Sequence, residues 1–171
     1  GARSINNIVD ITNFILHETG QPLHAFDAAK IQGKKVVVKK CAQDTLFVSL
    51  DEKERKLTAQ DLMICDTEKP LCIAGVFGGL NSGVSATTNS IFLESAWFEN
   101  VHIRKTSVHH GLRTDAATRF EKGVDIASTV KVLEKAAAMI QEIAGGKCSK
   151  VVDVYPNPAE KVKVSMTFAY L

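Results

Sequence analysis

The sequence lacks the short motifs that mark nucleotide-hydrolysing enzymes and many hydrolases. It contains no GxxxxGK[ST] phosphate loop, no GxGxxG dinucleotide motif, no HExxH zinc motif and no G-x-S-x-G nucleophile elbow. His102, His109 and His110 have neither the spacing nor the cysteine partners of a zinc site. We therefore expect neither a metal ion nor a cofactor in this chain.

Paired cysteines and long apolar runs are missing as well. Cys41, Cys65, Cys72 and Cys148 form no C-x-x-C pair, so we expect reduced core thiols in a cytoplasmic protein. The sequence has no charged-then-apolar leader and no apolar run near eighteen residues, which argues against secretion and membrane insertion.

An excess of charge of one sign is absent too. The chain has 21 basic and 19 acidic residues, for a formal net charge of +2. Any contact with RNA must therefore come from a local patch rather than from an overall field. The 171 residues, 45% of them hydrophobic, suffice for one sizeable core. Because the sequence opens with Gly1-Ala2-Arg3 rather than Met, we expect a segment of a longer polypeptide.

Apolar spacing predicts a succession of helices and short strands. Helices are predicted over 5–19, ended by Gly20, over 98–109, ended by Gly111, and from Asp125 to a stop at Gly145. Strands are predicted over 36–40, 45–50, 62–66, 71–79, 90–95 and 151–155, and over the alternating segment 161–171. This order favours an α+β fold, a layered domain with mixed or antiparallel β-sheets covered by helices in β/β/α layers.

Several polar or glycine residues lie in apolar surroundings, and each allows two interpretations. Gly75, Gly78 and Gly79 follow a buried strand and fit either a hairpin turn or the wall of a pocket. Glu94, flanked by apolar residues in IFLESAWF, needs either a salt bridge to a core arginine or a ligand hydroxyl.

The first helix and the turn after it raise the same question. His24 follows the turn at Pro22 and is either a structural histidine or one that points into a cleft. Thr12 and Asn13 interrupt the apolar pattern of the first helix, either as a solvent-facing strip or as a polar notch over a pocket. The segment HGLRTDAATRFEKG, residues 110–123, is rich in charge and by composition alone predicts a loop between two helices.

Four motifs taken together carry a family resemblance. They are NNIVDITNFILHETGQPLHAFD, AGVFGGLNSGV, IFLESAWF and HGLRTDAATRFEKGVD, in this order. The set resembles the tRNA-editing domain of bacterial phenylalanyl-tRNA synthetase β subunits, over residues from about 4 to 155. The resemblance implies an editing domain over 1–155, and a linker with the first strand of the following domain over 156–171.

The resemblance also implies an activity and its partners. The domain would hydrolyse the ester of tRNA(Phe) mischarged with tyrosine, as part of the enzyme that attaches phenylalanine to tRNA(Phe). Its partners would be that tRNA, the synthetase α subunit and the remaining β-subunit domains in a heterotetramer. The resemblance implies a cytoplasmic location and no association with a membrane. ATP and magnesium would belong to the holoenzyme alone.

By the same resemblance, individual residues acquire roles. Glu94 would accept a hydrogen bond from the tyrosine phenol, and Gly75, Gly78 and Gly79 would line the pocket with backbone. Thr12, Asn13 and His24 would surround the ester and the attacking water as catalytic residues, while Thr114 and Ala116 would lie beside the amino-acid pocket. One departure is that many members carry Ser-His where this chain has Ala117-Thr118.

The mechanism and the function have alternatives. No Ser-His-Asp or Cys-His arrangement is visible in the sequence, which favours direct attack by water, assisted by His24 or by the terminal ribose hydroxyl of the tRNA. Asp115, Arg119 and Glu121 are expected to form an ion-pair network that fixes the rim of the pocket. The alternative functions are a non-catalytic RNA-docking or scaffold domain and a free-standing deacylase.

Overall fold

The computed structural model describes residues 3–158 and 163–167, in which four α-helices and several short strands form an α+β fold. The elements in order are α1 (Asn7–Thr19), β1 (Leu23–Asp27), η1 (Ala28–Lys30), η2 (Gln32–Lys34), β2 (Val37–Lys40), β3 (Leu46–Val48), β4 (Glu54–Lys56), β5 (Leu62–Cys65), β6 (Pro70–Ile73), β7 (Phe77–Gly78), β8 (Ile91–Ser95), α2 (Asn100–His110), α3 (Asp115–Lys122), η3 (Ile126–Ser128) and α4 (Thr129–Ala144).

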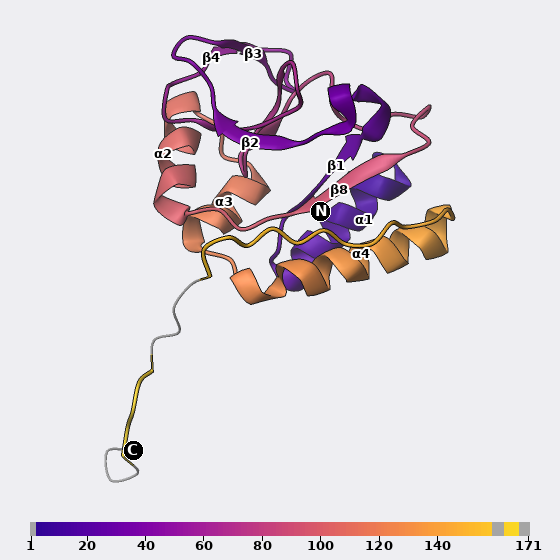
Figure 1. The fold of residues 1–171 in the computed structure, drawn as a ribbon, viewed down its shortest axis with the longest axis vertical. Coiled ribbons are helices and arrows are strands. Elements are labelled where there is room, and N and C mark those ends of the chain that lie inside the picture. The colour runs from indigo at the N-terminus through magenta and orange to yellow at the C-terminus, as the bar shows by residue number, and fades with distance from the viewer. Residues whose placement is uncertain (1–2, 159–162, 168–171) are drawn as a thin grey trace.

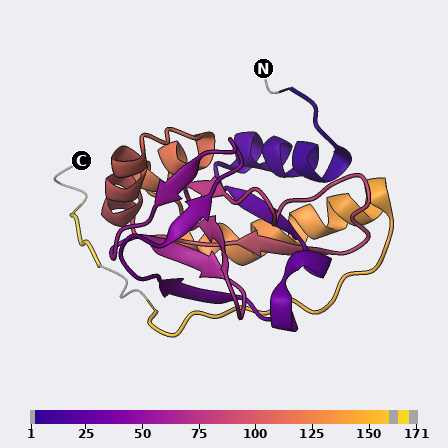
Figure 2. The same cartoon turned by 90° about the horizontal axis from the view of Figure 1, so that it is seen from above.

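The strands form three small antiparallel sheets. One has four strands in the order β2-β5-β6-β7, and the other two are the ribbons β1-β8 and β3-β4. In the view of Figure 2 the strands occupy the middle of the molecule, with helices around them. The prediction of an α+β fold with antiparallel sheets is confirmed.

Two hydrophobic cores lie on opposite faces of the β1-β8 ribbon. The smaller core packs Ile11 and Ile15 of α1 against Ala136 of α4, with Leu23 and Leu93 of the ribbon beside them. Figure 1 shows α1 and α4 running next to each other along this ribbon. Because side chains alternate along a strand, the neighbouring positions of β1 and β8 face the other way, toward the larger core. The ribbon therefore has one face closed by two helices and a second face turned toward the four-stranded sheet.

The larger core joins that sheet to helices α2 and α3. Its buried members include Met63 and Ile73 from the sheet, Ile103 from α2 and Phe120 from α3. The rings of Phe98 and Phe120 meet edge to face with their centroids 5.0 Å apart, an arrangement that aromatic pairs favour. This packing fixes α3 against the turn between β6 and β7.

Most predicted elements form, with differences at particular places. The helices predicted over 5–19 and 98–109 and the one that ends at Gly145 are present, as are strands within 36–40, 45–50, 62–66 and 90–95. The strand predicted over 71–79 is instead two strands, β6 and β7, separated by a turn at Gly75, whose φ is +68°. The prediction missed strands β1 and β4.

Near the C-terminus the strand predictions fail where the structure describes the chain. Residues 151–155 form no strand, and their side chains are exposed, so the apolar pattern there has no sheet to join. Of the strand predicted over 161–171, the described residues 163–167 are not in a strand either, and the rest lies outside the described residues. The boundary at 155 and the assignment of 156–171 to a following domain stay predictions.

The charged segment 110–123 contains a helix rather than a loop. Gly111 ends α2 with φ +64°, and Thr114 then begins α3 by accepting a hydrogen bond from the Ala117 N–H. The expected ion-pair network of Asp115, Arg119 and Glu121 is wrong, since no salt bridge joins them in the described part of the chain. The structure is stabilised there by helix capping and by burial of Ala117 and Phe120.

Candidate functional site

The pairing of β1 with β8 brings His24 directly opposite Glu94. These residues are register partners in the antiparallel ribbon, so their side chains lie on the same face, about 5 Å apart at Cβ. That face is the one turned toward the four-stranded sheet, because Leu23 and Leu93 on the other face pack against the helices. Two residues that lie far apart in the sequence thus form one polar pair.

Both members of this pair have buried polar atoms without a partner. His24 and Glu94 are partly exposed as whole residues, yet His24 Nε2 and Glu94 Oε2 are closed to solvent and accept or donate no hydrogen bond. The salt bridge to a core arginine that the sequence left open for Glu94 does not form among the described residues. Each group therefore retains an unused hydrogen-bonding capacity.

Burial sets the protonation state of both groups. Desolvation lowers the pKa of His24 to about 4 and raises the pKa of Glu94 to about 8. At neutral pH the imidazole is therefore uncharged and most of the carboxyl group is protonated. The site combines two neutral groups, each able to exchange hydrogen bonds with a polar ligand.

Cys72 and Gly78 of the four-stranded sheet lie against this pair. They are register partners on β6 and β7. Burial, and then the neighbouring Glu94, raise the pKa of the Cys72 thiol well above its ordinary value. A Cβ on Gly78 would lie 3.1 Å from His24 Cε1 and 2.9 Å from Leu50 Cδ1. The missing side chain at 78 therefore leaves the space that the imidazole ring occupies.

The other two predicted glycines face protein rather than the polar pair. A Cβ on Gly75 would meet Phe98 Cδ2 at 2.8 Å, and one on Gly79 would meet the Leu71 carbonyl oxygen at 2.5 Å. Gly75 takes up the left-handed conformation of the turn, and Gly79 allows two backbones to approach closely. These contacts explain why both positions are glycine, and the assignment of their backbone to the pocket wall stays a prediction.

Thr114 and Ala116 lie at the start of α3. The Thr114 hydroxyl donates to the Val76 carbonyl oxygen at 2.7 Å and accepts from the Ala117 N–H at 3.1 Å, so it joins α3 to the β6-β7 turn. Ala116 is partly buried against the larger core, and Thr118 donates to the Thr114 carbonyl oxygen. The Thr114 hydroxyl thus has partners within the fold.

Thr12 and Asn13 lie on α1, which covers the helix side of the ribbon. Thr12 is buried and its hydroxyl donates to the Val9 carbonyl oxygen at 2.9 Å. Asn13 is partly buried, and its amide makes no hydrogen bond within the described residues. No hydrogen bond joins either residue to His24. Their assignment as catalytic residues stays a prediction.

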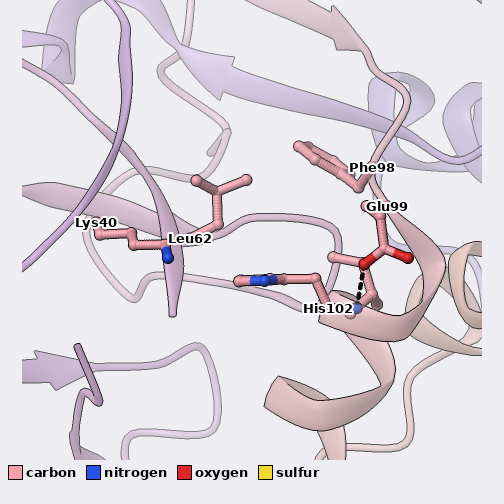
Figure 3. Close-up of a pocket in the computed structure, with 6 residues that line it drawn as sticks. Lys40, Leu62, Phe98, Glu99 and His102 are labelled. Carbon is pink, nitrogen blue, oxygen red and sulfur yellow. Dashed lines mark hydrogen bonds between the residues drawn. The ribbon is translucent and has the colours of Figure 1, made fainter. Parts of the chain in front are cut away.

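A separate apolar pocket of about 290 Å³ lies between α2 and the four-stranded sheet. Figure 3 shows Phe98 and Glu99 on one side of it, Lys40 and Leu62 on the other, and the ring of His102 between them. None of the predicted site residues lines it. The Glu99 carboxylate is engaged in capping α2 through the Val101 and His102 N–H groups.

Two features are absent from the part of the chain that the structure describes. Within these ranges, no group of three or more His, Cys, Asp or Glu side chains could hold a metal ion. Among the same residues, none of the helices has the length and apolar character that a bilayer crossing requires.

Comparison with known proteins agrees with the motifs. The profile of the B3/4 domain family matches residues 1–145. The chain belongs to the B3/4 domain family. It is 55% identical over 169 residues to the phenylalanine–tRNA ligase β subunit of Porphyromonas gingivalis, an alignment that covers 98% of this chain and 21% of that protein.

Other β subunits give the same result for this B3/4 domain. The identity is 53% over 169 residues to the subunit of Bacteroides fragilis, and 49% over 168 residues to that of Bdellovibrio bacteriovorus, each with 98% of this chain and 21% of the relative covered. The chain thus spans about a fifth of the length of these relatives. The resemblance to β subunits that the four motifs predict is confirmed.

Sequence reasoning missed the burial of Gln21 and expected ion pairs for Arg119 that the described residues do not form. Gln21 is 1% exposed and its Oε1 has no partner, and Arg119 Nε is likewise buried without one. For Gln21 a signal existed, because a polar residue between Gly20 and Pro22 precedes a buried strand. Arg119 was expected in an ion-pair network, and no local signal indicated that its Nε would be buried, since a charged residue on a short helix is ordinarily solvated.

Proposed function

We propose that this B3/4 domain hydrolyses the ester of tRNA(Phe) mischarged with tyrosine, as the editing module of a phenylalanine–tRNA ligase β subunit. The observation that carries the proposal is the polar pair of His24 and Glu94, whose Nε2 and Oε2 atoms are buried without partners. Buried polar groups are ordinarily satisfied, so an unpartnered pair calls for a ligand with complementary polar atoms. A mischarged tyrosyl ester has such atoms at both ends.

Glu94 gives the site its preference for tyrosine over phenylalanine. Its buried carboxyl group can exchange a hydrogen bond with a phenol, whether protonated, as its pKa of about 8 implies at neutral pH, or ionised. A phenyl ring in the same place leaves Oε2 buried and unpaired, at a cost of about 1–3 kcal/mol. That cost corresponds to roughly 5- to 150-fold discrimination. An aminoacylation site with an apolar pocket for phenylalanine discriminates poorly against the added hydroxyl of tyrosine, which is why a second, hydrolytic site is useful.

His24 orients the attacking water rather than deprotonating it fully. With a pKa of about 4 the imidazole is neutral at pH 7 and its ring nitrogen can accept a hydrogen bond from water. Protonating a group whose pKa lies about three units below the ambient pH costs about 4 kcal/mol, so the ribose hydroxyl of the tRNA assists in removing the proton. A backbone N–H group beside the ester stabilises the oxyanion.

The remaining parts of the proposal concern the whole protein. The domain acts within a synthetase that also contains the α subunit and the other β-subunit domains, in the cytoplasm, and ATP and magnesium serve aminoacylation outside this segment. Thr12 and Asn13 are assigned to the ester site although α1 covers the other face of the ribbon, and Ala116 is assigned the role of keeping space for the amino acid. These assignments rest on similarity to β subunits.

The test uses the intact synthetase that contains this domain. Release of tyrosine from Tyr-tRNA(Phe) is compared with release of phenylalanine from Phe-tRNA(Phe), for the wild type, for Glu94→Ala and for Glu142→Ala as a control at an exposed glutamate of α4. We expect the wild type and the control to favour the tyrosyl ester, and Glu94→Ala to lose most of that preference.

Two results would count against the proposal in different ways. A wild type that releases neither amino acid above the rate of spontaneous hydrolysis favours a non-catalytic RNA-docking domain. Full discrimination by Glu94→Ala removes the role of that carboxyl group while leaving hydrolysis intact. Ala116→Trp provides a third arm, since an indole in place of a methyl group should fill the pocket and abolish hydrolysis of both esters.

A further inference from the structure

Leu50 bounds the space beside Gly78, and it is not among the residues that the sequence assigned to the ester site. It belongs to the turn between β3 and β4. A Cβ on Gly78 would lie 2.9 Å from Leu50 Cδ1, 3.1 Å from His24 Cε1 and 3.5 Å from His24 Nε2. The leucine and the imidazole therefore approach one point from two sides. The edge of the ring that carries the unpartnered Nε2 faces that point.

Backbone pairing fixes Leu50 opposite Gly78. The Leu50 N–H donates to the Gly78 carbonyl oxygen at 3.0 Å, and the preceding Ser49 is the antiparallel bridge partner of Gly79. Residues that lie directly opposite each other in such a pair have their side chains on the same face. Leu50 is therefore held on the face of β7 along which Gly78 leaves room for His24.

Polar bonds around Arg55 hold the turn that carries Leu50. The guanidinium of Arg55, on β4, donates to the Asp51 carboxylate at 2.7 Å and to the Ser49 hydroxyl at 2.8 Å. Its third bond, at 2.9 Å, goes to the His110 carbonyl oxygen at the end of α2. Because this guanidinium connects the turn to a helix that packs in the larger core, the position of Leu50 is set by the fold.

The surroundings of the His24 ring are apolar or uncharged. The ring of Phe26, also on β1, meets the imidazole edge to face with the centroids 4.4 Å apart, and Leu50 approaches from the hairpin. The titratable groups on the neighbouring strands, Glu94 of β8 and Cys72 of β6, have raised pKa values and are mostly protonated at pH 7. Burial is what lowers the pKa of His24, so the imidazole depends on its apolar neighbours to stay uncharged.

Leu50 itself lies half in solvent, whereas the ring atom beside it is dry. The leucine is 45% exposed, and His24 Nε2 is closed to solvent. One side of the leucine therefore faces water while its Cδ1 atom faces the space at Gly78. A half-exposed leucine contributes less to a core than a buried one, so the shielding of the imidazole is the more specific consequence of this position.

We propose that Leu50 is a positioning residue of the ester site, which covers the His24 imidazole on the hairpin side and keeps bulk water from its Nε2 atom. The inference rests on the proposed function, because it assumes that His24 orients the attacking water. An imidazole open to bulk water holds no single water in one direction, whereas a shielded imidazole can hold the water that faces the ester. Leu50 thus acts through His24 and takes no part in the chemistry.

The first readout is the reactivity of His24 in the intact synthetase, which does not require hydrolysis. Carbethoxylation by diethyl pyrocarbonate, which attacks the neutral imidazole, is followed by mass spectrometry of the His24 peptide between pH 5 and 7.5. The variant is Leu50→Ala, and the control is Leu46→Ala, a 54% exposed leucine on the same face of β3. We expect His24 to react several times faster in Leu50→Ala than in the wild type or the control. Its reactivity should also fall below about pH 6.5 in that variant alone, because the wild-type pKa is about 4.

The second readout is hydrolysis of Tyr-tRNA(Phe) by the same proteins, after urea unfolding has shown equal folded fractions. We expect Leu50→Ala to lower kcat about tenfold with little change in KM, because the water is less well oriented while the ester still binds. Leu50→Met, which restores an apolar cover of similar volume, should recover most of the kcat.

The two readouts together decide the inference. If Leu50→Ala leaves either the reactivity of His24 or the kcat at the wild-type value, the inference is overturned. The same holds if Leu46→Ala changes both as much as Leu50→Ala does. If His24 becomes more reactive in Leu50→Ala while the wild type hydrolyses neither ester, the cover over the imidazole stands and the proposed function fails.

Discussion

Replacing Glu94 with glutamine tests whether the fold holds a protonated carboxyl group on the ribbon face. Burial raises the pKa of this group from 4.5 to about 8. Between these two values the folded chain keeps a proton that the unfolded chain releases, so the free energy of unfolding falls as pH rises. Each pH unit corresponds to about 1.4 kcal/mol, which gives a loss of about 3 kcal/mol by pH 7 and about 4 kcal/mol by pH 8, where the folded chain is itself half ionised.

Glutamine has the shape of the protonated acid and cannot ionise. We therefore expect Glu94→Gln to match the wild type near pH 4.5 and to be more stable by about 3 kcal/mol at pH 7 and about 4 kcal/mol at pH 8. Urea unfolding at a series of pH values measures the difference. A difference that stays constant from pH 4.5 to 8 would refute the reasoning, since it would mean that the carboxyl group titrates alike in the folded and unfolded chain.

His24 contributes a slope of the opposite sign over part of this range. Its pKa is lowered from 6.5 to about 4, so the unfolded chain binds a proton that the folded chain does not, and stability is lost as pH falls from 6.5 to 4. The two slopes oppose each other between pH 4.5 and 6.5. The wild type should show a nearly flat profile there, whereas Glu94→Gln, with only the histidine slope, should gain stability as pH rises.

Two further predictions concern packing away from the polar pair. Gly79→Ala should destabilise the chain by about 1–3 kcal/mol in urea unfolding, because the new Cβ would meet the Leu71 carbonyl oxygen. The control Gly83→Ala, which has open space around it, should change the free energy of unfolding by less than half of that. Equal costs of the two substitutions would contradict the close approach of the backbone at Gly79. Asp61→Ala should cost about 3–5 kcal/mol, because it leaves His110 Nε2, which lies 2.8 Å from the Asp61 carboxylate, buried without a partner; an unchanged thermal midpoint would show that this bond is dispensable.

The elements that the sequence predicts best are those with long apolar stripes. Helix α4 repeats its apolar residues over sixteen residues and α1 over thirteen, so each pattern can be recognised locally. Helix α3 has eight residues and buries only Ala117 and Phe120. Its many charged residues leave no apolar periodicity that would identify it as a helix in the sequence. Its capping threonine and the acidic residue after it were the available signals. Strand β1 is short and follows a proline, which leaves too few residues for a visible alternation.

The candidate site depends on contacts that no local pattern contains. Taken alone, Glu94 and His24 each fit a purely structural role. Glu94 could form a salt bridge in the core, and His24 could form a hydrogen bond within the fold. Only the register of β1 with β8 places the two residues opposite each other. His24 Nε2 and Glu94 Oε2 have no partner among the described residues, which argues against both structural roles. A resemblance supplied these residues by name, but the physical reason to connect them comes from the sheet.

The unsatisfied atoms make a stronger argument when their positions are combined. Gln21 Oε1, His24 Nε2 and Glu94 Oε2 are all buried without partners, and they belong to two segments joined by the β1-β8 ladder and by the Gln21 bond to Ala96. Unpaired polar groups cost about 1–3 kcal/mol each, which is a large share of the stability of a single domain. Two such costs on the ribbon and a third just before it favour a ligand-binding role, because apolar side chains of similar volume would make the fold more stable. Under the proposed function, the tyrosyl ester supplies polar atoms to the His24-Glu94 pair and offsets those two costs.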